Sequence, residues 1–135
     1  MVVREEYWQA AQIASDICGV PAEWIYSQWY HETAGWNSEL CKDYNNLGGL
    51  TQEEENDLPQ PDGSYYYMKF QSIESYARYF GKYIKKWFPH AAQATSMQDY
   101  AYQLKYGEEY VYYGASLEEY TSGMEHAYSL AFDSP

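Results

Sequence analysis

Hydrophobic residues recur at helical spacing along most of the chain. Tyr7, Ala11, Ala14 and Cys18, for example, follow one another at intervals of three or four, which is the period of one helix face. The pattern predicts helices over residues 4–18, 21–34, 72–88, 96–106 and 116–131, with a short helical turn at 38–42. These segments make the protein mainly helical.

Residues that favour helix ends lie where the pattern starts and stops. Gly19, Gly35 and Gly107 each follow a predicted helix, and glycine readily adopts the left-handed conformation that closes one. Pro21 fits the first position of the second helix. The predicted N-terminal caps, whose side chains accept a bond from a free backbone N–H, are Ser72, Ser96 and Ser116.

The region between the second and third long helices has no helical period. Residues 45–50 read Asn-Asn-Leu-Gly-Gly-Leu and predict a loop, and prolines at 59 and 61 break any helix after it. Asp62 and Gly63 are typical of a hairpin turn, and residues 64–70 are rich in strand-forming tyrosine. We therefore expect one domain over residues 1–135, mainly α (α+β), with about five helices and a small β-hairpin lobe.

Composition excludes some classes of partner. The formal net charge is -12, with only 8 basic residues and no basic run longer than Lys85-Lys86. Nucleic acids and anionic membrane surfaces bind clustered Lys and Arg, so neither is expected as a partner. No apolar stretch is long enough to span a membrane. Arg4, Glu5 and Glu6 stand where a signal peptide would be apolar, so we expect a removed leader or another export route.

Aromatic residues are abundant, with 18 Tyr and 5 Trp. Most are expected in the core, and the rest suit a groove on which sugar rings stack. The two cysteines, Cys18 and Cys41, have no metal-site spacing; a disulfide and two buried thiols both remain open. His31-Glu32 would begin a zinc-protease motif, but Gly35 stands where its second histidine belongs. Neither a metal nor a cofactor is expected.

Glu32 is the first candidate for chemistry. It lies near the end of the second predicted helix, at helical spacings from Trp24, Ile25 and Trp29. Apolar surroundings disfavour the charged carboxylate, so they raise its pKa toward the value that a general acid needs near neutral pH. The alternative is a glutamate on the solvated side of the same helix.

A second acidic group follows in the predicted lobe. Glu53, Glu54, Glu55 and Asp57 lie 21 to 25 residues after Glu32. Glycosidic cleavage usually uses two carboxyl groups across the sugar bond. A helix and a facing lobe could supply them, although a solvated acidic loop is the better explanation of any single member.

The order of these segments resembles a known family. Residues 27–38 read SQWYHETAGWNS, residues 45–50 read NNLGGL, residues 67–75 read YMKFQSIES, and residues 112–115 read YYGA. This set resembles the glucosaminidase family of bacterial cell-wall hydrolases, including flagellar and phage-borne enzymes, over roughly residues 10 to 130. The resemblance implies a lysozyme-like fold. This chain departs from the family pattern in a shorter segment between Leu50 and Phe70.

The resemblance also implies roles for individual residues. Glu32 matches the catalytic acid, and Tyr113, rather than its neighbour Tyr112, is preferred as the late catalytic tyrosine. Glu55 or Asp57 would be the second catalytic carboxylate, although Glu53 and Glu54 remain open. Gln28, one turn before Glu32, would orient it or bind substrate, although an ordinary polar residue on the helix surface is the slightly favoured alternative. The substrate-binding residues would be Gln28, Trp36, Asn45, Asn46 and Tyr112.

The function that the resemblance implies is hydrolysis of β-1,4 bonds in the glycan strands of peptidoglycan, after N-acetylglucosamine. The protein would then be secreted, cell-wall-associated or phage-associated, as a monomer or as part of a larger chain. A muramidase or lytic transglycosylase on the same fold is an alternative. A glycan-binding module without catalysis is the alternative from another class, and a structural scaffold in a phage tail is a third.

Overall fold

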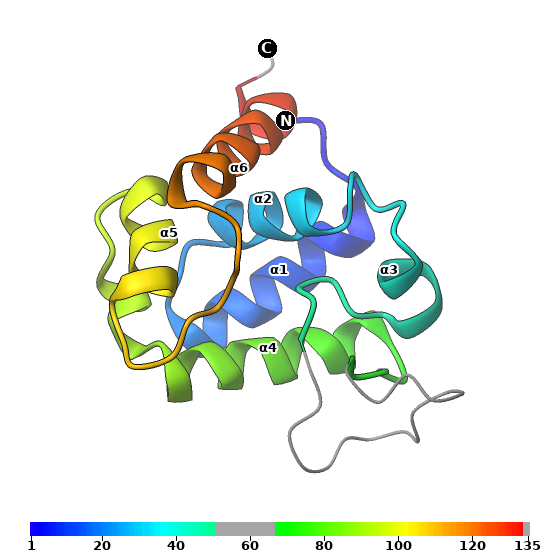
Figure 1. Cartoon of the computed structure of the whole chain (residues 1–135). Coiled ribbons are helices and arrows are strands. Elements are labelled where there is room, and N and C mark those ends of the chain that lie inside the picture. The colour runs from blue at the N-terminus through cyan, green and yellow to red at the C-terminus, as the bar shows by residue number, and fades with distance from the viewer. Residues whose placement is uncertain (51–66, 134–135) are drawn as a thin grey trace.

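The structure of the protein is a computed structural model that describes residues 1–50 and 67–133. Helices account for most of these residues (Figure 1). In chain order they are α1 (Glu5–Cys18), α2 (Ala22–Glu32), α3 (Glu39–Tyr44), α4 (Ile73–Trp87), the 3-10 helix η1 (Pro89–Gln93), α5 (Met97–Tyr106) and α6 (Leu117–Phe132). The predicted mainly helical fold is therefore confirmed.

Most predicted helix ends are confirmed by their caps. The side chains of Ser72, Ser96 and Ser116 accept hydrogen bonds from backbone N–H groups three residues ahead, and Gly19 is left-handed at φ 81°. Several boundaries differ from the prediction by one or two residues, among them both ends of α2. Pro21 is the N-cap of α2 and not its first residue, and α2 ends at Glu32 instead of Ala34.

The helices pack around one hydrophobic core. α1 packs against α2 and α4, and α2 packs against α6, while α5 lies against α6 and η1 (Figure 1). Small residues let α1 and α4 approach closely. A Cβ atom at Gly81 would lie 2.8 Å from Ile17 Cβ and 3.0 Å from the carbonyl oxygen of Ala14.

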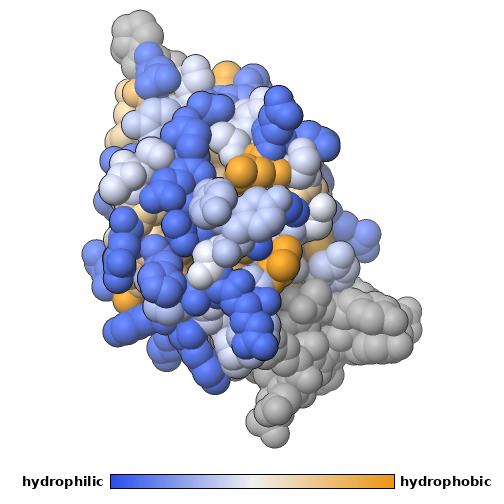
Figure 2. All heavy atoms as spheres, turned by 60° about the vertical axis from the view of Figure 1, so that its left-hand side comes forward, coloured by the Kyte–Doolittle hydropathy of each residue, from blue (hydrophilic) through white to orange (hydrophobic). Residues whose placement is uncertain are grey.

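Aromatic rings fill much of this core. Trp29, Tyr76, Tyr100 and Tyr120 are each at most 1 % exposed. The face that carries α5 is mostly hydrophilic, with small separate hydrophobic patches (Figure 2). Its exposed large apolar or aromatic residues include Tyr102 and Tyr106.

The base of the predicted lobe is visible, although residues 51–66, which would form most of its hairpin, lie outside the described part. Met68 N donates to the carbonyl oxygen of Leu50 at 3.0 Å, and Phe70 N donates to that of Tyr44 at 2.8 Å. Backbone hydrogen bonds therefore join the segment that precedes residues 51–66 to the segment that follows them.

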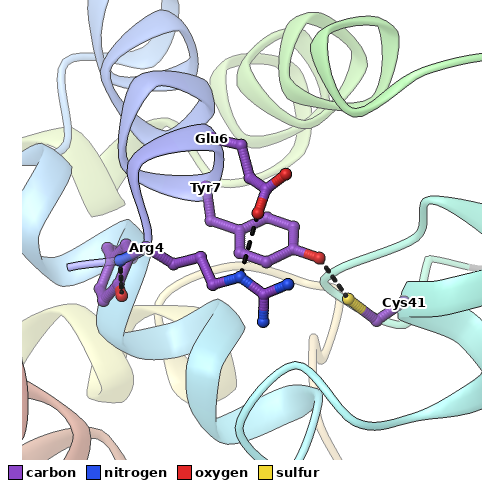
Figure 3. A network of polar contacts seen from close by, with 5 residues as sticks. Arg4, Glu6, Tyr7 and Cys41 are labelled. Atoms are coloured by element: carbon purple, nitrogen blue, oxygen red, sulfur yellow. Dashed lines mark hydrogen bonds and ion pairs between the residues drawn. The ribbon is translucent and has the colours of Figure 1, made fainter.

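Cys18 and Cys41 are both buried, free thiols. The sequence left open a disulfide or two buried thiols, and the structure has the two thiols. The Cys41 thiol donates to the hydroxyl of Tyr7 at 3.5 Å, and this bond joins α3 to α1 (Figure 3). The exposed ion pair of Arg4, the N-cap residue of α1, and Glu6 on α1 lies beside Tyr7.

The two ends of the described chain meet at one side of the molecule. Val2 N donates to the carbonyl oxygen of Ala131 at 2.8 Å, so the N-terminal segment runs along the end of α6 (Figure 1). Of the helices described here, none combines the length and the apolar character that crossing a membrane requires.

Candidate active site

Glu32 is the last residue of α2, and the chain turns sharply after it. The hydroxyl of Thr33 donates to the carbonyl oxygen of Trp29 at 2.8 Å and accepts from Trp36 N at 2.9 Å. Ala34, Gly35 and Trp36 then adopt left-handed φ angles of 51°, 72° and 70°. Such angles cost an ordinary residue roughly 1–2 kcal/mol, so contacts elsewhere must hold the turn.

Those contacts come from the ring of Trp36. It stacks on Tyr7 with ring centroids 4.1 Å apart and meets Tyr26 and Tyr30 edge-on. Trp36 is only 6 % exposed. The structure therefore places this side chain in the core, where it fixes the turn behind Glu32, and its substrate contact stays a prediction.

The Glu32 carboxyl is partly buried, and burial raises its pKa from the ordinary 4.5 to about 7. A hydrogen bond from the hydroxyl of Tyr120 acts in the opposite direction and lowers the pKa. The raised pKa agrees with the sequence prediction, although the residues around the carboxyl include tyrosines from three other parts of the chain. These are Tyr76, Tyr112 and Tyr120.

Gly48 and Gly49 belong to the loop of residues 45–50, called the glycine loop below, which comes close to the Glu32 carboxyl. Gly49 has φ 67°, and a Cβ atom there would lie 3.4 Å from Glu32 Oε2. At Gly48 a Cβ atom would lie 2.6 Å from the hydroxyl oxygen of Tyr112 and closer still to that of Tyr76. Gly48 can therefore lie this close to the two tyrosine hydroxyls only because it has no side chain.

Asn45 and Asn46 hold this loop in place. Asn45 Nδ2 donates to the carbonyl oxygen of Phe70 at 2.9 Å. Asn46 Nδ2 donates to the carbonyl oxygens of Leu50 and Met68, and its Oδ1 accepts from Leu50 N. Asn46 is 1 % exposed, and its bonds tie together the segments on either side of residues 51–66. Its role in substrate binding stays a prediction.

The two adjacent tyrosines point in different directions. The Tyr112 hydroxyl donates to the carbonyl oxygen of Gly48 at 3.0 Å and lies close enough to Glu32 to interact with its charge. The Tyr113 hydroxyl donates instead to the carbonyl oxygen of Ala101 at 2.9 Å. The structure thus brings Tyr112, and not the preferred Tyr113, to Glu32; the Tyr113 ring stacks on Tyr120, with centroids 3.6 Å apart.

Gln28 is fully buried, so it cannot be the polar surface residue or the direct substrate ligand that the sequence left open. Its Oε1 accepts from the Tyr100 hydroxyl at 2.5 Å, and its Nε2 donates to the Tyr120 hydroxyl at 3.1 Å. Tyr100 and Tyr120 were missed as site residues. Their only sequence signal is helical spacing, which also marks ordinary core positions.

The predicted second carboxylates, Glu55 and Asp57, lie with Glu53 and Glu54 outside the described residues, so their role stays a prediction. Within residues 1–50 and 67–133, no three His, Cys, Asp or Glu side chains are grouped to hold a metal ion. What the described residues provide is one partly exposed carboxyl group that can carry a proton near neutral pH and release it. This is the requirement for a general acid.

Comparisons with known proteins agree with this chemistry. The model of a glucosaminidase family, described as mannosyl-glycoprotein endo-beta-N-acetylglucosaminidase, matches residues 8–130. Comparison with curated protein sequences gives no significant match.

Three solved structures share the fold at low sequence identity. A peptidoglycan hydrolase from Sphingomonas sp. A1 has a TM-score of 0.71 at 15% identity, covering 97% of this chain and 94% of that one. The glycoside hydrolase domain of FlgJ from Salmonella typhimurium has a TM-score of 0.68 at 13% identity, covering 93% of each. The catalytic domain of the autolysin Auto from Listeria monocytogenes has a TM-score of 0.62 at 17% identity, covering 96% and 87%.

Proposed function

Because the chain belongs to the glucosaminidase family, whose model matches residues 8–130, we propose that it cleaves the glycan strands of peptidoglycan. The bond would be the β-1,4 bond that follows N-acetylglucosamine, and the place of action would be the bacterial cell wall. The observation that carries the proposal is the Glu32 carboxyl, with its pKa raised to about 7. The similar structures, which include a peptidoglycan hydrolase and the catalytic domain of an autolysin, support the substrate class.

In the proposed reaction Glu32 begins protonated. Its proton passes to the glycosidic oxygen as the bond between that oxygen and the anomeric carbon breaks, and the sugar acquires oxocarbenium character. Glu32 becomes a carboxylate. A lobe carboxylate, Glu55 or Asp57, would stabilise that cation or activate the water that replaces the leaving group. The acetamido group of the substrate is the alternative for this second role.

Glu32→Gln tests the proposal because it keeps the shape of the side chain and removes the proton. Purified peptidoglycan would be digested with the wild type and the variant, and the soluble fragments would be identified by mass spectrometry. We expect release by the variant to fall by about 10²–10⁴-fold, the usual contribution of a general acid. Glu23→Gln, an exposed change on the same helix, should leave release unchanged.

The ends of the fragments identify the bond. Reducing N-acetylglucosamine ends support the proposal. Reducing muramic ends would make the protein a muramidase, and anhydro-muramic ends a lytic transglycosylase. If neither protein releases fragments while both bind the wall, the chain is a glycan-binding module and the proposal is wrong.

A further inference from the structure

A chain of buried hydrogen bonds crosses the core toward Glu32. It starts at the hydroxyl of Tyr100 on α5, which donates to Gln28 Oε1 on α2 at 2.5 Å. Gln28 Nε2 donates to the hydroxyl of Tyr120 on α6 at 3.1 Å. Gln28 lies one helical turn before Glu32 on α2, so the Tyr120 hydroxyl is held beside the Glu32 carboxyl, and its interaction with that carboxyl lowers the Glu32 pKa. Tyr100 and Gln28 are 0 % exposed and Tyr120 is 1 % exposed, so water does not compete for these bonds.

The chemistry of the amide gives this chain a direction. An amide oxygen only accepts hydrogen bonds and an amide nitrogen only donates them. The 2.5 Å separation at Tyr100 fits an O–H donor, and the 3.1 Å separation at Tyr120 fits an N–H donor. Because Gln28 already donates to the Tyr120 oxygen, the single proton of Tyr120 is free to point at Glu32.

We infer that Tyr100, Gln28 and Tyr120 are positioning residues, which hold the Glu32 carboxyl and direct one hydrogen bond to the carboxylate formed when it gives up its proton. The inference rests on the proposed role of Glu32 as the acid. Tyr120 is the member whose hydroxyl interacts with Glu32, whereas Tyr100 and Gln28 act through Tyr120. We refer to the three residues as the relay.

Among the described residues, no positively charged group is found to stabilise the Glu32 carboxylate in place of the Tyr120 hydroxyl. The titratable groups that interact with Glu32 are hydroxyls, from Tyr76 on α4, Tyr100 on α5, Tyr112 in the following loop and Tyr120 on α6. Burial raises the pKa of every one of these tyrosines, so all stay neutral near pH 7. Of the groups described around Glu32, Tyr120 is the one whose hydrogen bond lowers its pKa, against the opposing effect of burial.

The relay matters because a general acid needs both protonation states. Burial keeps the proton on Glu32 before the reaction, and the Tyr120 hydroxyl stabilises the carboxylate afterwards. Without that hydroxyl Glu32 would hold its proton more tightly and be a weaker acid.

Tyr120→Phe removes the last member of the relay and keeps the ring that stacks on Tyr113. The full chain with ¹³C-labelled glutamate would be titrated by NMR, and Glu32→Gln would identify the Glu32 signal. We expect Tyr120→Phe to raise the midpoint of the Glu32 titration by about one pH unit, as for the loss of one hydrogen bond to a carboxylate. Tyr100→Phe should raise it by less, since it acts through two bonds.

Tyr26→Phe is the matched control. It removes another buried hydroxyl, which accepts from Arg4 N at 3.0 Å and has no recorded interaction with Glu32. Its Glu32 midpoint should equal that of the wild type. If Tyr120→Phe also leaves the midpoint unchanged, the inference is wrong; if that variant does not fold, an unchanged midpoint in Tyr100→Phe overturns it.

Activity separates this inference from the proposed function. The alkaline limb of peptidoglycan release should move upward by about one pH unit in Tyr120→Phe, which a merely structural role would not cause. If Glu32→Gln abolishes release while Tyr120→Phe moves neither the limb nor the NMR midpoint, the function stands and the relay does not. If the wild type releases nothing but the midpoint moves, the relay stands and the proposed function fails.

Discussion

Gly48→Ala should destabilise the protein by crowding the glycine loop against two tyrosine hydroxyls. The added methyl group would lie 2.6 Å from the hydroxyl oxygen of Tyr112 and closer still to that of Tyr76. Real Cβ atoms do not tolerate such contacts, so the loop or the tyrosines must move. Tyr112 is tied to the same residue, because its hydroxyl donates to the Gly48 carbonyl oxygen at 3.0 Å.

The magnitude follows from these two effects. Overpacking a close-packed core costs about 1–3 kcal/mol, and loss of the Tyr112 bond adds about 1 kcal/mol. Gly48 is not left-handed, so alanine fits its backbone and recovers a few tenths of a kcal/mol by restricting the unfolded chain. We therefore expect the free energy of unfolding to fall by about 2–3 kcal/mol.

Urea unfolding followed by circular dichroism measures this change at equilibrium. Gly114→Ala is the control, because a Cβ atom there meets nothing within 4 Å. This variant should leave the free energy of unfolding unchanged. Tyr76→Phe should restore part of the loss, since it removes one of the two crowded oxygens. A Gly48→Ala variant as stable as Gly114→Ala would refute the close approach that the structure shows, and so would the absence of rescue by Tyr76→Phe.

Two further predictions concern Glu32 and the turn behind it. Folding raises the Glu32 pKa from 4.5 to about 7, so the folded state holds a proton that the unfolded state releases, and wild-type stability falls as the pH rises through this window. Glu32→Gln lacks this loss and should be more stable than wild type by about 3 kcal/mol at pH 8 and equal to it near pH 4. A stability difference that does not vary with pH would contradict this. Gly35→Ala places a methyl group at φ 72° and 3.2 Å from the Tyr30 ring, so it should lower the free energy of unfolding by about 1–2 kcal/mol. Ala34→Gly, which relieves the strain at φ 51°, should not lower it, and equal losses in both variants would count against strain as the cause.

Local signals in the sequence predicted most of the fold. Ser72, Ser96 and Ser116 cap the helices that they were expected to begin, because capping depends on residues only three positions apart. The end of α2 was predicted too late because Ala34, Gly35 and Trp36 adopt left-handed backbone conformations that end the helix. Trp36 accepts a left-handed backbone only because its ring is held by Tyr7, Tyr26 and Tyr30, and no local pattern reports that packing.

The site was less predictable, because its parts come from distant segments. The raised pKa of Glu32 could be inferred from apolar neighbours on its own helix. The hydrogen-bond partners of Gln28 lie 72 and 92 positions away in the sequence. From its own helix alone, Gln28 therefore could not be told from an ordinary polar residue on the helix surface. Tyr112 and Tyr113 are adjacent, and only the conformation of their loop decides which hydroxyl turns toward Glu32.

The bond between Val2 N and the carbonyl oxygen of Ala131 makes the described chain almost a closed ring. Both ends leave the molecule beside α6, away from the glycine loop near Glu32 (Figure 1). A domain with neighbouring ends can be inserted into another protein without forcing the host's two attachment points apart. By the same geometry, a short linker could join the two ends of the described chain, residues 1 and 133, and new ends could be opened in a connection between helices. The order of helices along the gene is therefore separable from their arrangement in space.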